Sequence, residues 1–243
     1  MAAEKGFYPE YFSRKNYLCS MYAEIAVENY YHAKDAYDRL KEMDYYCGET
    51  GDEIDKLNKC SAISVVFSAA AIEAFLNDYS AACLGDEEFY DNFDKLSVLS
   101  KLQLIAKFIM HTTIDKSKSY YGCLKILERE RNELIHSKSV AITGVGYTKS
   151  EYEELQKSFH EADDDSEWEI DISSYSEPFR TAKNGIIAMK DLALFFDRND
   201  KNAHAVICFF SPLSNQIRSE KNHPMVQVLR DFDIPTKHQK DEL

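Results

Sequence analysis

Few residues in this sequence interrupt a helix. The 243 residues include only 8 glycines and 5 prolines, whereas 16 tyrosines and 14 phenylalanines provide bulky side chains for packing. Glycine and proline are the strongest markers of turns, so their scarcity predicts long uninterrupted segments. The sequence therefore favours an all-α fold over a β-fold with many turns.

Apolar residues recur at helical spacing in five segments. These segments are residues 13–48, 52–83, 96–112, 117–138 and 176–199. A short polar turn around Asp115 joins the third segment to the fourth, and short connections make neighbouring helices antiparallel. We predict an antiparallel helical bundle over residues 14–198. Its core is predicted to include three residues of the fourth segment and three of the first two: Leu127, Leu134, Ile135, Ile25, Ile63 and Phe67.

The sequence changes character after about residue 199. Residues 205–210 (AVICFF) form a short apolar run rich in β-branched and aromatic side chains, which predicts a buried strand. Residues 226–229 (VQVL) predict a second strand, and residues 168–172 are a strand candidate before the fifth helix. We expect residues 199–243 to form a small C-terminal extension, containing short strands, that packs on the bundle.

The formal net charge of −13 argues against general affinity for phosphate backbones, because nucleic-acid binding depends on local positive potential. The acidity is uneven. Residues 151–169 hold nine acidic groups against one lysine, a net charge of −8, so the other 224 residues carry only −5. This acidic segment is predicted to be a solvated loop or helix face.

Two features of the sequence bear on the cellular compartment in which the protein is found. The first residues, MAAEKGFYP, lack the basic start and apolar run of a secretory signal, and no window approaches 18 consecutive apolar residues. We expect a cytoplasmic protein that is neither exported nor membrane-spanning. The last four residues, KDEL, spell an endoplasmic-reticulum retention address, which is read only on proteins inside that compartment, so we interpret them as coincidental.

The six cysteines are scattered, with no pair at the spacing of a zinc knuckle or a redox motif. Gly144-Val145-Gly146 lacks the rest of a nucleotide-binding fingerprint and indicates a turn. We therefore expect reduced thiols, no metal and no cofactor.

One segment of the fourth predicted helix suggests a reaction: Arg131-Asn132-Glu133-Leu134-Ile135-His136. At about 100° per residue, Asn132 and His136 share a face of a helix, whereas Arg131 lies roughly 140° from His136. A site that combines them needs a bent helix end or two protomers. The alternative is a surface arginine and a histidine that the dipole favours at a helix end.

This segment, together with the run Ser68-Ala-Ala-Ala-Ile-Glu-Ala-Phe-Leu-Asn77 on the second helix, resembles the HEPN superfamily. In that family a helical bundle carries an arginine, a histidine a few residues later, often an asparagine directly after the arginine, and a polar residue on an earlier helix. Arg131, His136, Asn132 and Glu73 match these places. By helix order the resemblance extends over about residues 14–198, although the specific matches are confined to these two segments.

The resemblance implies metal-independent cleavage of RNA by a homodimer, in which the arginine and histidine of two protomers face a shared cleft. His136 would move a proton between the ribose 2′-oxygen and the leaving 5′-oxygen, since imidazole has an ordinary pKa of about 6.5. Arg131 would be the permanent cation that stabilises the phosphate in the transition state. Arg129, which also has the family spacing to the histidine, ranks second because no asparagine follows it. Glu73 either orients Arg131, makes a structural hydrogen bond or lies at an exposed edge position.

Some family toxins carry a tyrosine two residues after the histidine, where AMP is attached to silence them. Here that position is Lys138, which argues against that form of control. The expected function is a metal-independent endoribonuclease of toxin-antitoxin or anti-phage defence. Its expected partners are single-stranded RNA, a second copy of the chain, and an antitoxin or defence-system protein. The alternatives are a non-catalytic HEPN-like module that binds RNA, a nucleotide or a protein, and an unrelated helical interaction protein.

Overall fold

A computed structural model describes residues 18–43, 48–136, 172–200, 202–211 and 223–235. Within these ranges all regular secondary structure is helical and no strand occurs. The all-α prediction is confirmed.

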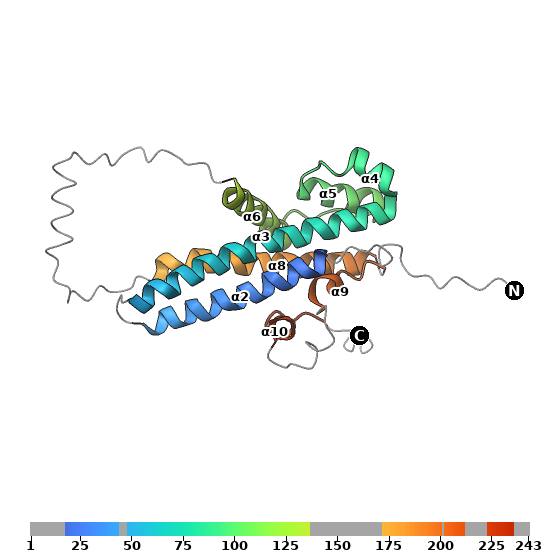
Figure 1. Cartoon of the computed structure of the whole chain (residues 1–243). Coiled ribbons are helices and arrows are strands. Elements are labelled where there is room, and N and C mark those ends of the chain that lie inside the picture. The colour runs from blue at the N-terminus through green and yellow to red at the C-terminus, as the bar shows by residue number, and fades with distance from the viewer. Residues whose placement is uncertain (1–17, 44–47, 137–171, 201, 212–222, 236–243) are drawn as a thin grey trace, which may run out of the picture.

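Three long helices form the centre of the bundle. α2 (Leu18–Glu42), α3 (Gly48–Leu84) and α8 (Ser176–Asn199) run alongside one another, and α2 is antiparallel to α3 (Figure 1). At 1.5 Å per residue, the 37 residues of α3 span roughly 55 Å. Apolar residues at helical spacing on all three helices are fully buried, so these helices supply most of the core.

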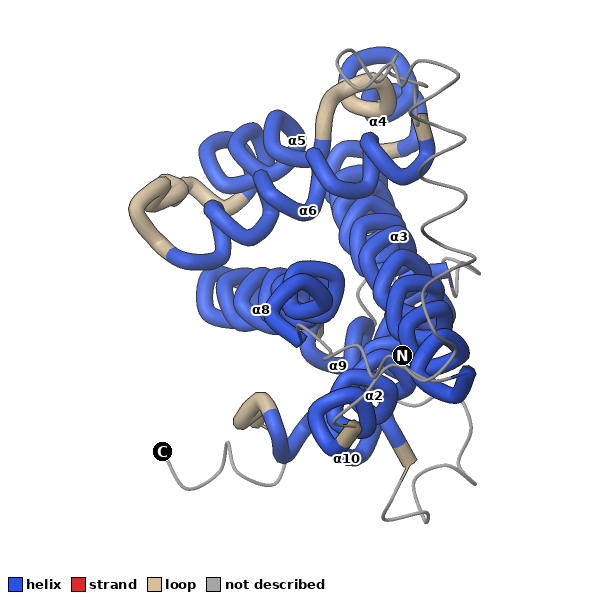
Figure 2. Tube along the Cα trace, turned by 90° about the vertical axis from the view of Figure 1, so that its left-hand side faces the viewer, coloured by secondary structure: helices blue, strands red, loops and turns tan. Residues whose placement is uncertain are grey.

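The central part of the chain lies on one side of α3. α4 (Asp86–Asn92), α5 (Val98–Leu104) and the π-helix η1 (Ile105–Ile109) precede α6 (Ser119–Ile135), which contacts both α3 and α8 (Figure 2). The polar turn predicted around Asp115 is present, and the carboxylate of Asp115 accepts hydrogen bonds from the backbone and the hydroxyl of Ser117.

The third predicted helix, 96–112, is α5 followed by η1. In η1 the N–H of Met110 donates to the carbonyl of Ile105 at 3.0 Å, five residues back. This wider turn ends at His111, whose φ of 52° lies in the left-handed region and stops the helix.

The strands predicted after residue 199 are wrong. Residues 205–210 form the helix α9 (Ala205–Phe210), and residues 226–229 lie in the helix α10 (Pro224–Asp231). α9 contacts α2 and α8, and α10 contacts α2. Of the strand candidate 168–172, only Ile172 is described, and it begins the short 3-10 helix η2 (Ile172–Tyr175); residues 168–171 lie outside the described residues.

The predicted packing of α6 is correct only for its buried part. Leu127 is 2% exposed, whereas Leu134 is 46% and Ile135 48% exposed. Ile25, Ile63 and Phe67 are half-buried. Within one chain, therefore, Leu134 and Ile135 lie outside the core, because the last turn of α6 extends beyond the surfaces of α3 and α8 that cover the preceding turns.

One described helix is long and apolar enough to span a membrane by length and composition, namely α3, over Glu49–Leu84. Within its most apolar window, 44% is buried inside the protein, and α3 contacts α2, α6 and α8. The core helix of a folded bundle can meet the same criterion.

Candidate functional site

The regular buried face of α6 determines where its polar residues point. Tyr120, Leu124 and Leu127 are buried and follow one another at intervals of four and three residues, so they form the stripe that packs on α3 and α8. The next position on this stripe is Arg131. Its side chain accordingly lies along the face that meets α3 and is 34% exposed.

Glu73 faces Arg131 from α3. Arg131 Nη2 lies 3.6 Å from Glu73 Oε2, and the Glu73 side chain is 37% exposed. Arg131 Nη1 donates a hydrogen bond to Oδ1 of Asn132 at 3.0 Å. A partly exposed ion pair stabilises a fold by at most about 1 kcal/mol. The main consequence of these two contacts is therefore the orientation of the guanidinium group.

A pocket of about 120 Å³ opens beside this ion pair. Its polar lining consists of Glu73, Ser97, Glu128, Arg131 and Asn132, and the rest is apolar side chains of α3, α6 and the region where α5 begins. This volume accommodates several water molecules or a small ligand group. Three of the predicted site residues, Glu73, Arg131 and Asn132, thus line one pocket.

His136 is not among the residues that line this pocket. α6 ends at Ile135, and His136 leaves the helical path with φ −109° and ψ 32° while its N–H donates to the carbonyl of Asn132 at 2.9 Å. Its side chain is exposed. Because the helix has ended, the rotation of about 100° per residue no longer fixes the direction of this imidazole relative to Arg131.

Arg129, the second-ranked arginine, also lies outside the pocket lining. Its side chain is 63% exposed and forms ion pairs with Glu130 and Glu133 of the same helix. Those carboxylates raise the pKa of the Arg129 guanidinium, which stays charged in any case. The position of Arg131 on the buried stripe, rather than charge or spacing to the histidine, distinguishes the two arginines.

Lys101 is a residue of this region that the sequence analysis missed. It belongs to α5 and has no exposed surface. Its Nζ donates to Asn77 Oδ1 at 2.7 Å and lies 3.9 Å from Glu73 Oε1. Burial lowers the pKa of Lys101, while the charges of Glu73 and Asp94 act in the opposite direction.

A signal for Lys101 does exist in the sequence. The apolar stripe of the third predicted helix runs through Val98, Leu102 and Ile105, and Lys101 occupies the position between the first two, three residues after Val98. A lysine on such a stripe must either be buried with partners or interrupt the packing. Looking for its partner on a neighbouring helix leads to Glu73 and Asn77.

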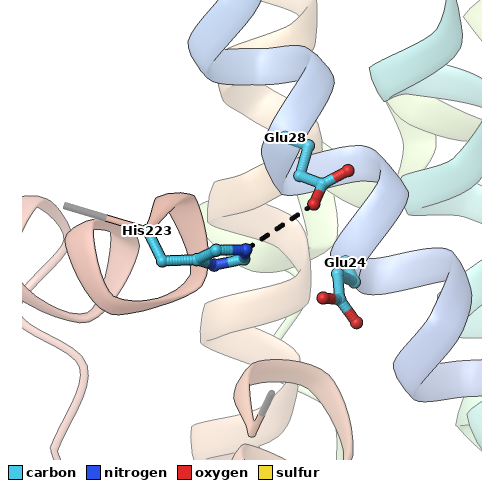
Figure 3. A group of neighbouring side chains, drawn as sticks. All are labelled: Glu24, Glu28 and His223. Carbon is cyan, nitrogen blue, oxygen red and sulfur yellow. Dashed lines mark ion pairs between the residues drawn. The ribbon is translucent and has the colours of Figure 1, made fainter. Parts of the chain in front are cut away.

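A second group of polar side chains has the composition of a metal site. Glu24 and Glu28, one turn apart on α2, and His223, which precedes α10, offer ligand atoms that all lie within 4.8 Å of one another (Figure 3). His223 Nε2 lies 3.8 Å from Glu28 Oε1. Two carboxylates and an imidazole are ligands that transition metals accept.

The hydrogen bonding of His223 opposes this use. His223 is the N-cap of α10, and its Nδ1 accepts the N–H of Met225 at 3.2 Å. An Nδ1 that accepts a hydrogen bond has no proton, so in the neutral ring Nε2 carries the proton and donates toward Glu28. Binding a metal through Nε2 would move the proton to Nδ1 and break the cap. The arrangement is therefore that of a capping histidine that joins α10 to α2.

No protein-family model matches the chain, and no curated protein and no solved structure shows significant similarity to it.

Proposed function

We propose that this protein is a metal-independent endoribonuclease of the HEPN type that acts as a homodimer on single-stranded RNA. The observation that carries the proposal is the contact of Glu73 with Arg131 beside a pocket that Asn132 also lines. The carboxylate on the earlier helix, the arginine and the asparagine were singled out from two separate segments of the sequence. Their convergence supports a common function for the two segments.

The end of α6 supports the dimeric part of the proposal. His136 is exposed there, next to Leu134 and Ile135, which are about half exposed although they are large and apolar. Exposed apolar side chains beside a polar site are typical of an interaction surface. In the proposed dimer the last turns of the two α6 helices meet, and His136 of the partner subunit completes the pocket of Arg131.

The proposed reaction is an attack of the ribose 2′-oxygen on the adjacent phosphorus. His136 removes the proton of the 2′-hydroxyl, the new bond between the 2′-oxygen and phosphorus forms, and the bond from phosphorus to the 5′-oxygen breaks. The proton ends on the leaving 5′-oxygen, so the products are a 2′,3′-cyclic phosphate and a 5′-hydroxyl. Arg131 donates hydrogen bonds to the non-bridging phosphate oxygens as their charge increases.

A second candidate function keeps the HEPN-like fold without catalysis. Two carboxylates, Glu73 and Glu128, line the pocket together with the single guanidinium of Arg131. This balance of charge favours a ligand with a cationic or hydrogen-bonding group over a bare phosphate. A module that binds a nucleotide through its base, or a protein through a basic side chain, would fit this observation.

The test of catalysis uses RNA cleavage in EDTA. Wild type is expected to cleave a single-stranded oligoribonucleotide and to leave 2′,3′-cyclic phosphate ends. Arg131→Ala and His136→Ala each remove a contribution worth on the order of 10²-fold in rate. Both side chains are at least one third exposed, so the thermal unfolding midpoint is expected to change little.

Arg129→Ala and His32→Ala are the matched controls. Arg129 lies on the same helix outside the pocket lining, and His32 is an exposed histidine of α2. Both variants are expected to cleave like wild type. Unchanged cleavage by Arg131→Ala and His136→Ala would refute the assignment of these residues. Absence of cleavage by wild type, with measurable binding of RNA or a nucleotide, would favour the non-catalytic module.

A further inference from the structure

Lys101 is an unusual residue for the core of a bundle. Its side chain is fully buried, and burying an ammonium group costs several kcal/mol unless partners compensate. Only two side chains of the described residues contact its Nζ at polar distance: Asn77 at 2.7 Å and Glu73 at 3.9 Å. Both come from α3, four residues apart, and so face α5 from one side of that helix.

The contacts continue from Lys101 to the pocket. Glu73 uses its two oxygens in different directions, because Oε1 faces Lys101 Nζ at 3.9 Å whereas Oε2 faces Arg131 Nη2 at 3.6 Å. A carboxylate between two cations has fewer free rotamers than one held by a single partner. Asn77, Lys101, Glu73 and Arg131 thus form a row of contacts. Asn77 and the buried Lys101 are one end of this row, and the guanidinium group of Arg131 is its end at the pocket.

We infer that Lys101 is a positioning residue, which holds Glu73 so that Arg131 is directed into the pocket. The inference rests on the proposed function, since it assigns to Lys101 a part in the same site. Lys101 is not among the residues that line the pocket. Its effect on Arg131 passes through Glu73.

A purely structural role for Lys101 makes a different prediction. Buried ions can often be replaced by apolar residues of similar volume with little loss of stability, or with a gain. If Lys101 only filled space, Lys101→Met would fold and leave the pocket as it is. If Lys101 holds Glu73, the same variant would fold and yet release Glu73 and Arg131.

The first measurement is RNA cleavage in EDTA by Lys101→Met, Glu73→Gln and the double variant. We expect each single variant to lower kcat by about 10-fold or more, with KM changed far less, because misplacing a group that acts in the transition state reduces the rate of the chemical step. The double variant should lose no more than the larger single loss, since both changes break the same row. Lys107→Met, an exposed lysine of η1, is the matched control and should cleave like wild type.

The second measurement needs no activity. The Nε–H signal of Arg131 in nitrogen-15 NMR spectra is identified by its loss in Arg131→Ala. In Lys101→Met this signal should move toward its position in Glu73→Gln, whereas in Lys107→Met it should stay in place. Should Lys101→Met fail to fold, Lys101→Gln removes the charge, keeps a donor for Asn77, and is measured in the same way.

The two measurements distinguish a failure of the positioning role of Lys101 from a failure of the proposed RNA cleavage. Wild type that cleaves no RNA refutes the proposed function, while a shifted Arg131 signal in folded Lys101→Met still supports the positioning of Arg131 by Lys101. An unshifted signal in a folded variant overturns the inference, whether or not wild type cleaves RNA. Additive losses of cleavage in the double variant would also contradict it, because independent residues do not share one row of contacts.

Discussion

At the scale of single residues, the buried charge of Lys101 should appear in the pH dependence of stability. Its folded-state pKa is lowered from 10.5, chiefly by burial. The unfolded chain therefore binds more protons than the folded one between the two pKa values, so the contribution of Lys101 to stability rises with pH in that window. Unfolding by urea at a series of pH values should show wild type gaining stability relative to Lys101→Met as the pH rises toward 10.5. A constant difference between the two proteins would contradict this prediction.

Other residues change the pH dependence of the free energy of unfolding, but they change it equally in wild type and in Lys101→Met. Burial raises the pKa of Tyr30 to about 12 and also raises that of Tyr31, so their contributions are fully present below about pH 10 and are lost at higher pH as the unfolded chain ionises first. Both tyrosines are present in wild type and in Lys101→Met. Lys107→Met, which removes an exposed lysine, should keep the wild-type pH dependence.

Residue patterns predicted part of the candidate site for a definable reason. Arg131, Asn132 and Glu73 were singled out because the two segments that contain them resemble the HEPN pattern, which can be compared with the sequence one helix at a time. Lys101 is marked in the sequence only by its place on the apolar stripe of its helix, and its partners depend on which helix faces α5, which the sequence does not state. His136 was singled out by the same resemblance, but its placement relative to Arg131 depends on where α6 ends and, in the proposed dimer, on the second protomer.

At the scale of elements, a tight contact between α8 and α3 offers a sharp prediction. A Cβ atom added at Gly185 of α8 would lie 2.8 Å from Ser68 Oγ and 3.0 Å from Ser68 Cβ on α3. Gly185→Ala should therefore lower the free energy of unfolding by about 1–3 kcal/mol through overpacking. Ser68→Ala should restore part of the loss, because it removes the nearest atom, which has no hydrogen-bond partner among the described residues.

Gly122→Ala is the control for Gly185→Ala. Gly122 lies inside α6 with nothing within 4 Å of an added Cβ, so this change should stabilise the protein by about 0.5–1 kcal/mol through helix propensity alone. Thermal or urea unfolding of the variants measures both effects. A stabilising Gly185→Ala would show that α3 and α8 are free to move apart at this contact.

Helices were predicted correctly where the apolar periodicity extends over many turns, and the prediction failed where the apolar segment is short. The segments that became α3 and α8 contain many turns of apolar periodicity, and their ends were predicted within a few residues. Residues 205–210 are six apolar residues in a row, which a helix and a buried strand accommodate equally well. The start of α9 depends instead on a distant side chain, because Asp197 Oδ1 accepts the N–H of Ala205 at 2.6 Å.

The start of α10 has a local signal that the strand prediction for residues 226–229 did not use. Pro224 occupies the first turn of the helix, where proline is favourable because its missing N–H costs nothing. His223 then caps the helix through the N–H of Met225. A histidine cap is less usual than serine or aspartate, so no familiar N-cap residue precedes this helix.

At the scale of the whole molecule, net charge restricts how the proposed RNA substrate could be bound. A chain with a charge of −13 repels a polyanion at long range, and a dimer would carry twice that charge. In the proposed function, RNA binding would therefore come from local contacts at the pocket and not from the overall field. This condition agrees with a site in which one arginine is held in place, and it makes the assembly of two such sites in one cleft the decisive question.

Assembly is the last prediction. Wild type should sediment as a dimer at micromolar concentration, because the last turn of α6 leaves Leu134 and Ile135 half exposed beside His136. Ile135→Glu should raise the dissociation constant of the dimer about 30-fold or more, as expected for an apolar residue at the centre of an interface. It should not lower the unfolding midpoint of the monomer, since Ile135 is 48% exposed in one chain.

Phe108→Glu is the control, because Phe108 is even more exposed, at 60%, but lies on η1. If the cleft is shared, Ile135→Glu should lose RNA cleavage together with the dimer, whereas Phe108→Glu should keep both. Wild type that cleaves RNA as a monomer would show that one chain supplies the complete site.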